Sequence, residues 1–255
     1  MNSELTILLQ AVREAGAAIL EIKRTGFSIQ KKSNNDVLTQ ADLLANDILK
    51  QRLTEAFPTY GWLSEESADS TERLACERVW IVDPIDGTKE FATGIPEYAI
   101  SVALVENGEP IVAAVFNPET DELFHAVKGQ GAWQGQQRIF CQPNPVDRFT
   151  LLASRSEFDR GEWDRFTASH QVKIVGSIAY KLGLIAAGKA DATFSLGNKS
   201  EWDVAAGALL VTEAGGAVTN QIGKSLIFNQ KNILINGIVA TSANATNAIH
   251  TLIAI

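Results

Sequence analysis

The spacing of apolar runs changes near residue 145, and this change limits the possible folds more than any other feature. Before it, four strand-like runs follow one another at 79–82, 98–105, 111–116 and 122–127. The dipeptides Asn107-Gly108 and Asn117-Pro118 lie between runs, and such pairs favour tight turns. The runs therefore predict an antiparallel meander, which ends at Pro143-Asn144-Pro145.

Beyond residue 145, strand-like and helix-like segments alternate. Strands are predicted at 150–153, 172–175 and 192–195, and helices at 157–168, 178–187 and 204–213. Strands separated by helices need crossover connections, which favour a more parallel sheet. Two amphipathic helices are predicted nearer the start, at 5–22 and 44–57. We therefore predict an α+β half over 1–145 and an α/β half over 146–255, with a ligand site between them.

The composition indicates a globular protein. With 255 residues, 45% of them hydrophobic, the chain can bury one large core or the cores of two fused halves. The formal charge of −8 weighs against binding the backbone of long nucleic acids, which needs clustered Lys and Arg. A small anionic ligand would need local cations. We expect a monomer or a homodimer.

The sequence also favours a cytoplasmic location without membrane insertion. No window reaches the ~20 apolar residues that a membrane span requires. The first residues show a helical pattern interrupted by Glu4 and Arg13, which differs from a signal peptide. Cys76 and Cys141 are the only cysteines and lack C-x-x-C spacing, so a disulfide scaffold or a thiolate zinc site is disfavoured.

The stretch IVDPIDGTKEF at 81–91 places two aspartates at the end of a predicted strand. Pro84 fixes one backbone angle between Asp83 and Asp86, and Gly87 lets the chain turn sharply. Both carboxylates can therefore be aimed at one point. Because two such charges held close together repel each other, the stretch predicts a bound cation.

Three other acidic features strengthen this prediction. The stretch GWLSEES contains Glu65 and Glu66, SEWDVAAG contains Asp203, and NNDVLTQAD contains Asp36 and Asp42. Taken singly, these carboxylates have ordinary interpretations as solvated loop charges, helix caps or partners of a helix dipole. Together with the paired aspartates they indicate a site built from carboxylates.

The ordered set of motifs resembles the inositol monophosphatase superfamily of magnesium-dependent, lithium-sensitive phosphatases. The motifs are SEES at 64–67, DPIDGT at 83–88, GS at 176–177, WDVAAG at 202–207 and TEAGG at 212–216. The resemblance covers nearly the whole chain. It implies a layered α/β/α/β/α sandwich, which agrees with the two-part pattern but does not follow from it.

The resemblance also implies a set of metal ligands. Glu65, Asp83 and the backbone carbonyl of Ile85 would hold one Mg²⁺, and Asp83, Asp86 and Asp203 would hold a second. Oxygen ligands of this kind suit Mg²⁺. Two such ions can activate a water and stabilise the leaving oxygen of a phosphoryl transfer. We also predict that Asp86 is a catalytic residue, because it would be a charged ligand of the second Mg²⁺.

Further roles follow from the same resemblance. Glu65 and the Thr88 hydroxyl would orient the attacking water and accept its proton, and Gly87 with Thr88 would begin a short helix that faces the phosphate. The alternative for Thr88 is an ordinary N-cap. Asp36 and Asp42 match positions that shape a third, weaker metal site, and simple helix capping is their alternative.

The residues around these motifs help to predict which substrate the enzyme acts on. DGTKEF at 86–91 is typical of the 3′(2′),5′-bisphosphate nucleotidases, which act on adenosine 3′,5′-bisphosphate, and LLASRSE at 151–157 is similar to another segment of that branch. Inositol phosphatases have an acidic residue where this chain has Leu196. The predicted substrate contacts are Gly87, Thr88, Ser154, Arg155, Gly176, Ser177 and Lys181.

We therefore predict a Mg²⁺-dependent phosphomonoesterase that uses a metal-activated water to convert adenosine 3′,5′-bisphosphate to AMP and phosphate. The segment GSIAYKLGLIAAGKAD has the length found in inositol phosphatases, so an inositol-1-phosphate phosphatase is the alternative. A catalytically silent protein that binds a nucleotide or a metal is a third interpretation. The presence of Glu65, Asp83, Asp86, Thr88 and Asp203 favours an enzyme.

Overall fold

The computed structural model describes residues 3–31, 37–142 and 148–254. Asp36 lies outside these ranges, so its predicted role in a third metal site stays a prediction. The segment Pro143-Asn144-Pro145 and the predicted boundary between halves at residue 145 also lie outside them.

Two long helices, α1 (Ser3–Thr25) and α2 (Gln40–Ala56), confirm the helices predicted near the start of the chain. One stripe of α1 is buried, and it comprises Leu8, Ala11, Val12, Ala15 and Ile19. Burying a Leu or Ile side chain stabilises a fold by ~1.5–3 kcal/mol, so this stripe fixes α1 against its neighbours. The helix α2 begins after Thr39, whose hydroxyl accepts a hydrogen bond from the Ala41 N–H at 3.2 Å.

A seven-stranded sheet carries the predicted meander. Its order is β3 (Gly61–Ser64), β4 (Arg78–Asp86), β5 (Ala99–Glu106), β6 (Glu109–Asn117), β7 (Glu122–Val127), β8 (Ala132–Gln134) and β9 (Gln137–Ile139). Strands β4 to β7 pair antiparallel, which confirms the meander, and only β3 pairs parallel, with β4. The pairing of β4 with β5 shifts register between Asp83 and Asp86, so the paired aspartates lie at an irregularity of the strand.

A second, five-stranded sheet lies beyond residue 145. Its order is β11 (Gln171–Ile174), β10 (Thr150–Ala153), β12 (Ala192–Ser195), β16 (Ile238–Thr241) and β14 (Ala217–Thr219). The predicted strands β10, β11 and β12 are parallel. The sheet is nevertheless mixed, because β16 runs antiparallel to both β12 and β14.

Helices alternate with these strands. They are α4 (Arg155–Asp159), α5 (Asp164–Thr167), α6 (Ile178–Ala186), α7 (Glu201–Glu213) and α8 (Thr246–Ile253). The helix predicted at 157–168 is wrong as one element, because Gly161 takes a φ of +76° and separates α4 from α5. The smaller elements are β1 (Ile29–Lys31), β2 (Val37–Thr39), the 3₁₀ helix η1 (Thr71–Ala75), α3 (Thr88–Thr93), β13 (Lys199–Ser200) and β15 (Leu234–Ile235).

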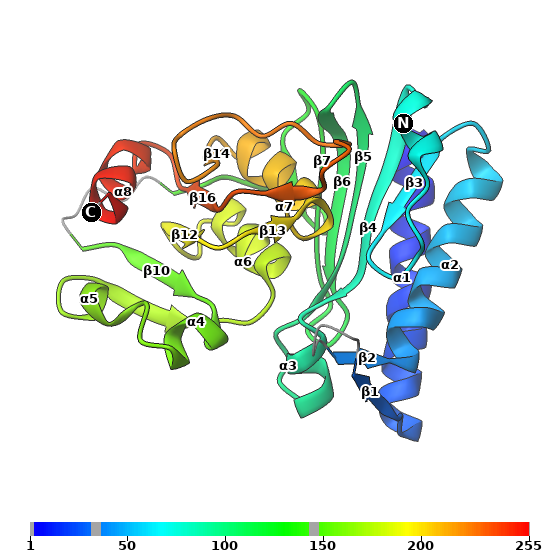
Figure 1. The fold of residues 1–255 in the computed structure, drawn as a ribbon, viewed down its shortest axis with the longest axis horizontal. Helices are drawn as coiled ribbons and strands as arrows, with labels where there is room; N and C mark the ends of the chain where they lie inside the picture. The colour runs from blue at the N-terminus through cyan, green and yellow to red at the C-terminus, as the bar shows by residue number, and fades with distance from the viewer. Residues whose placement is uncertain (1–2, 32–36, 143–147, 255) are drawn as a thin grey trace.

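The helices and sheets form five alternating layers (Figure 1). The helices α1 and α2 cover one face of the seven-stranded sheet, and α6 and α7 lie between that sheet and the five-stranded one. The far face of the five-stranded sheet packs against α5 and α8, through residues such as Phe166 and Ile249. The predicted α/β/α/β/α sandwich is therefore confirmed.

The two helices of the central layer approach each other closely at Gly207. A Cβ added to Gly207 of α7 would lie 2.3 Å from Leu182 Cδ1 of α6, so glycine allows the close approach of these helices. Because both helices also bury side chains against the seven-stranded sheet, segments from before and after residue 145 share one core. No helix within the described ranges is both long and apolar enough to span a membrane.

Candidate active site

The end of β4 forms the base of the candidate site. The Ile85 N–H donates to Asp83 Oδ1 at 3.0 Å, which turns the chain back toward the Asp83 carboxylate. Gly87 then takes a φ of +95°, and a Cβ there would lie 3.0 Å from the Glu97 carbonyl oxygen. Glycine is favoured at this position for both reasons. The short helix α3 begins at the next residue, Thr88, as predicted.

Asp203 reaches the same place from α7. It lies in the first turn of that helix, and its Oδ2 accepts a hydrogen bond from the Ser200 N–H at 3.0 Å in a capping box. Carboxylate oxygens of Asp83, Asp86 and Asp203 all lie within 4.8 Å of one another. The fold therefore brings together three carboxylates that are far apart in sequence.

The third carboxylate, Asp86, is held by the start of α6. Its Oδ2 accepts hydrogen bonds from the Ser177 hydroxyl at 2.5 Å and from the Ala179 N–H at 2.6 Å. Ser177 has a φ of +56°, a conformation that costs energy in a residue with a side chain. The contacts to Asp86 help to offset that cost, so the GS motif orients a carboxylate of the cluster.

The cluster is electrostatically unfavourable without a cation. Burial, together with the charges of Glu65 and Asp86, raises the pKa of Asp83 well above its usual value. Burial and the Asp86 charge do the same to the pKa of Asp203. Burial raises the pKa of Asp86 to about 6, although its two hydrogen bonds oppose the shift. A divalent cation would relieve this repulsion, and an all-oxygen donor set fits Mg²⁺.

A cleft of about 190 Å³ opens above the cluster. Its walls comprise Val37, Glu65, Asp83, Ile85, Asp86, Gly87, Thr88, Lys89, Glu90 and Asp203. The predicted ligand Glu65 follows β3 and is placed beside β4 because its N–H donates to the Val82 carbonyl at 3.2 Å. The described residues predicted to bind metal therefore line one cleft, apart from Asp42, which accepts a hydrogen bond from the Thr88 hydroxyl.

Thr88 and Asp42 form a contact that the sequence analysis did not predict. Thr88 Oγ1 lies 3.0 Å from Asp42 Oδ1 and 3.0 Å from the Ile85 carbonyl oxygen, so its single proton can be donated to either. The N-cap of α3 is Gly87, which shows that the N-cap interpretation of Thr88 is wrong.

Asp42 has the capping role that was its alternative interpretation. Its Oδ2 accepts hydrogen bonds from the Thr39 N–H at 2.7 Å and the Thr39 hydroxyl at 2.6 Å. The T-x-x-D spacing of Thr39 and Asp42 was the available signal for this capping box. The contribution of Asp42 to a third metal site stays a prediction.

The predicted substrate residues lie around the GS motif, within a network of carboxylates. Glu97 Oε2 accepts hydrogen bonds from Arg155 Nη2 at 2.6 Å and from the Gly176 N–H at 2.8 Å. Ser154 is the N-cap of α4, and its side chain makes no capping hydrogen bond. The sequence analysis missed Glu97, because an isolated glutamate in a loop carries no pattern that distinguishes it from a solvated charge.

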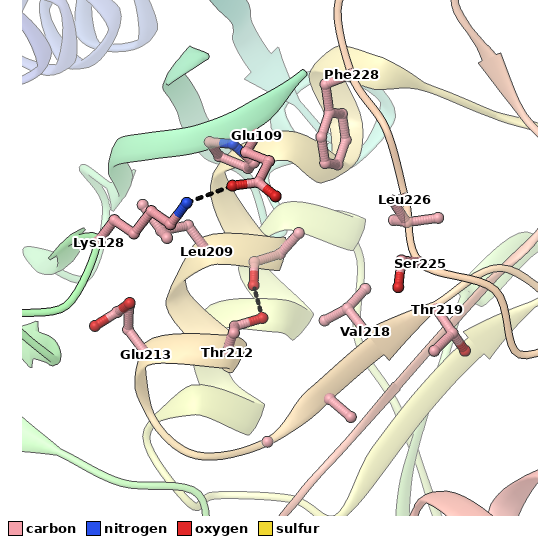
Figure 2. A pocket seen from close by; sticks show the side chains of 14 residues that line it. Glu109, Lys128, Leu209, Thr212, Glu213, Val218, Thr219, Ser225, Leu226 and Phe228 are labelled. Atoms are coloured by element: carbon pink, nitrogen blue, oxygen red, sulfur yellow. Dashed lines mark hydrogen bonds and ion pairs between the residues drawn. The ribbon is translucent and has the colours of Figure 1, made fainter. Parts of the chain in front are cut away.

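A larger cavity of about 470 Å³ lies at the other end of α7 (Figure 2). Leu209, Val218 and Phe228 contribute apolar walls, and an ion pair between Lys128 and Glu109 lies at one side. Its lining on α7 begins at Ala208, ~7.5 Å from Asp203 along a helix that rises ~1.5 Å per residue, and it shares no lining residue with the cleft. This cavity is therefore separate from the carboxylate cluster.

Comparison with known proteins identifies the family. A profile of the inositol monophosphatase family matches residues 1–254. The inositol-1-monophosphatase of Rhizobium meliloti is 35% identical over 232 residues, which cover 86% of each chain. The crystal structure of the extragenic suppressor protein SuhB from Bartonella henselae has a TM-score of 0.85 at 29% identity, covering 96% of each chain. CysQ from Bacteroides thetaiotaomicron, another bacterial member, has a TM-score of 0.78 at 28% identity and covers 95% of this chain and 98% of its own. The chain therefore belongs to the inositol monophosphatase family of phosphatases.

Proposed function

We propose that this phosphatase is a Mg²⁺-dependent enzyme that removes the 3′-phosphate from adenosine 3′,5′-bisphosphate. The single observation that carries the phosphatase chemistry is the cluster of Asp83, Asp86 and Asp203, whose oxygens lie within 4.8 Å of one another in the cleft. The stretch DGTKEF supports the nucleotide substrate, because it places Lys89 in the cleft wall beside the carboxylates. Leu196, 45% exposed, leaves no acidic group where inositol phosphatases have one.

The donor set fits the metals of the family. Glu65, Asp83 and the Ile85 carbonyl would hold one Mg²⁺, and Asp83, Asp86 and Asp203 a second, with Asp83 shared. Bound Mg²⁺ supplies positive charge that polarises the phosphate and lowers the pKa of a nearby water. The chain positions this donor set through three separate elements, which are β3 with its following loop, the end of β4 and the start of α7.

Thr88 and Asp42 can move the proton of the attacking water. When Thr88 Oγ1 donates to Asp42 Oδ1, its lone pairs remain free to accept a proton from a water in the cleft. Burial raises the pKa of Asp42, which makes this carboxylate a better proton acceptor. Glu65 in the same wall can orient that water. We propose that Ser154, Arg155, Gly176, Ser177 and Lys181 contact the substrate or position the groups that do.

Thr88→Ala is expected to lower turnover by ~10²-fold or more, since positioned proton transfer contributes ~10²–10⁴-fold. Mg²⁺ affinity should remain near the wild-type value, because Thr88 provides no metal ligand in the proposed site. Thr93→Ala in the same short helix is the matched control, since the Thr93 hydroxyl bonds only to the carbonyls of Lys89 and Glu90. Steady-state rates and Mg²⁺ titration by calorimetry measure the two effects. Near-normal turnover in Thr88→Ala would remove Thr88 from the mechanism.

The substrate is tested by phosphate release in Mg²⁺ from adenosine 3′,5′-bisphosphate, inositol 1-phosphate and fructose 1,6-bisphosphate, assayed side by side. We expect the highest kcat/KM for the nucleotide. The second candidate, an inositol-1-phosphate phosphatase, is favoured by the 35% identity to the Rhizobium meliloti enzyme of that name. A higher kcat/KM for inositol 1-phosphate would establish that candidate in place of the nucleotidase.

A further inference from the structure

Glu97 joins segments from before and after residue 145 close to the carboxylate cluster. It lies in the loop between α3 and β5, and 25% of its side chain is exposed. Its Oε2 accepts hydrogen bonds from Arg155 Nη2 at 2.6 Å and from the Gly176 N–H at 2.8 Å. Arg155 follows β10 and Gly176 follows β11, which are neighbouring strands of the five-stranded sheet. One carboxylate therefore ties a loop of the seven-stranded sheet to two strand-to-helix connections of the other sheet.

The hydrogen bond to Gly176 fixes the segment that holds Asp86. The next residue, Ser177, donates its hydroxyl to Asp86 Oδ2 at 2.5 Å, and the Ala179 N–H donates to the same oxygen at 2.6 Å. Gly176 also packs directly on α3, because a Cβ added to it would lie 2.5 Å from Glu90 Cγ. The two donors to Asp86 therefore directly follow the amide that the loop carboxylate holds, and a displacement of that amide would displace both of them.

Arg155 keeps the Glu97 carboxylate in place. Its Nε lies 3.6 Å from Glu90 Oε1, so one guanidinium faces two carboxylates. Burial and the charge of Glu97 raise the pKa of Glu90, whereas the charge of Arg155 lowers it. Without the guanidinium the two carboxylates would repel each other, and the partly exposed Glu97 would turn toward water. The planar fork of an arginine side chain suits such a bridge.

We propose that Glu97 and Arg155 are positioning residues, which hold Asp86 in the orientation that binds Mg²⁺. Arg155 fixes the Glu97 carboxylate, Glu97 fixes the Gly176 amide, and the donors that follow this amide fix Asp86. This role rests on the proposed function only through the metal, and it is independent of which phosphate ester the enzyme hydrolyses. It gives Arg155 a task other than contact with the substrate.

The direct test is Mg²⁺ binding, measured by calorimetry in the absence of substrate. Glu97→Ala removes the acceptor at a partly exposed position and should leave the fold intact. We expect the affinity of the Mg²⁺ site that contains Asp86 to fall by about tenfold, because loss of groups that orient metal ligands costs ~10–100-fold in affinity. Glu97→Gln keeps an oxygen that can accept from the Gly176 N–H, so its loss should be smaller. Wild-type Mg²⁺ affinity in Glu97→Ala would overturn the proposal.

Arg155→Met distinguishes positioning from contact with the substrate. The variant removes the charge but keeps an unbranched apolar stem, and its Mg²⁺ affinity should fall as in Glu97→Ala. Adding Arg155→Met to Glu97→Ala should cost less than about twofold more, because two residues that act through one contact are not additive. If Arg155 served only to contact the substrate, Mg²⁺ affinity would stay at the wild-type value and KM alone would rise. That result would refute the positioning role of Arg155.

Amide hydrogen exchange of the metal-free protein separates positioning from general stabilisation of the fold. The Ala179 N–H donates directly to Asp86, so its protection reports that contact. Glu97→Ala should speed exchange in the segment 176–179, while the amides of α1 stay as protected as in the wild type. If protection fell equally in both places and Mg²⁺ affinity did not change, Glu97 would only stabilise the fold, and the proposal would be wrong.

Glu106→Ala is the matched control. Glu106 accepts a hydrogen bond from Arg78 Nε at 2.7 Å, and 29% of its side chain is exposed, so its partner and its burial resemble those of Glu97. It lies at the opposite end of β5 from Ala99, which pairs with Asp86. Its Mg²⁺ affinity should match the wild type.

The same titration distinguishes failure of the positioning role from failure of the proposed function. If the wild-type protein bound no Mg²⁺, the proposed function and the positioning role would both fail. If the wild type bound Mg²⁺ and Glu97→Ala bound it equally well, only the positioning role would fail.

Discussion

Replacing Asp86 by asparagine is expected to lower turnover by at least ~10²-fold, equivalent to roughly 3 kcal/mol of activation free energy. The substitution keeps the shape of the side chain and its ability to accept from Ser177 and Ala179, but it removes one charged metal ligand. The same change should raise the thermal midpoint of the metal-free protein, because it removes one of three mutually repelling carboxylates. Steady-state kinetics and thermal scans in the presence of a chelator measure both effects.

The control for this variant is Asp121→Asn, whose side chain is 76% exposed and pairs with Arg13 far from the cleft. Turnover and thermal midpoint should both stay near their wild-type values, since exposed pairs contribute ~0–1 kcal/mol. If Asp86→Asn kept more than about a tenth of the wild-type rate, Asp86 would not be a required ligand. If Asp86→Asn lowered the thermal midpoint of the metal-free protein, repulsion among the three carboxylates would not be what destabilises it.

Magnesium is expected to stabilise the protein, and more strongly at pH 7 than at pH 5. A ligand at 100 times its Kd adds ~2.7 kcal/mol to the free energy of unfolding, which for a protein of this size is ~5–10 °C in thermal midpoint. Thermal scans with Mg²⁺ or with a chelator, at both pH values, measure the difference. Equal midpoints with and without Mg²⁺ at pH 7 would contradict the two-metal proposal.

The pH dependence follows from the raised pKa values. The pKa of Asp86 rises from 3.8 to about 6 on folding, so between these values the folded protein binds more protons than the unfolded chain. The free energy of unfolding of the metal-free protein therefore loses on the order of 3 kcal/mol from Asp86 alone as the pH rises through this window. The fully charged cluster above pH 6 is the form that Mg²⁺ stabilises. If Mg²⁺ raised the thermal midpoint more at pH 5 than at pH 7, the predicted direction of this pH dependence would be wrong.

Local patterns were sufficient to predict most of the elements. Turn dipeptides marked the meander, and periodic apolar residues marked α1, α2, α6 and α7. The predicted helix at 157–168 failed because Gly161 interrupts it with a positive φ, which the apolar pattern does not reveal. The antiparallel strand β16 was not predicted, because strand direction depends on contacts between distant segments rather than on local sequence.

The candidate site shows the same limit. The resemblance of the ordered motifs to the family predicted Glu65, Asp83, Asp86 and Asp203 as one set, but not which groups hold each of them. The bond from Thr88 to Asp42 joins residues far apart in the chain, and so does the pairing of Glu157 with Lys199. Neither contact has a sequence pattern, because both depend on how α2, α4 and β13 are placed by the core.

The central position of α7 has a consequence for synthesis of the protein. The seven-stranded sheet is complete in sequence at residue 139, but α7, which covers one of its faces and buries nine of its own residues, ends at residue 213. At roughly 5–20 residues per second, a ribosome leaves that apolar face uncovered for several seconds. A nascent chain at this stage has neither Asp203 nor a closed core. The growing polypeptide is therefore most prone to aggregate, and most dependent on chaperones, between these two points of translation.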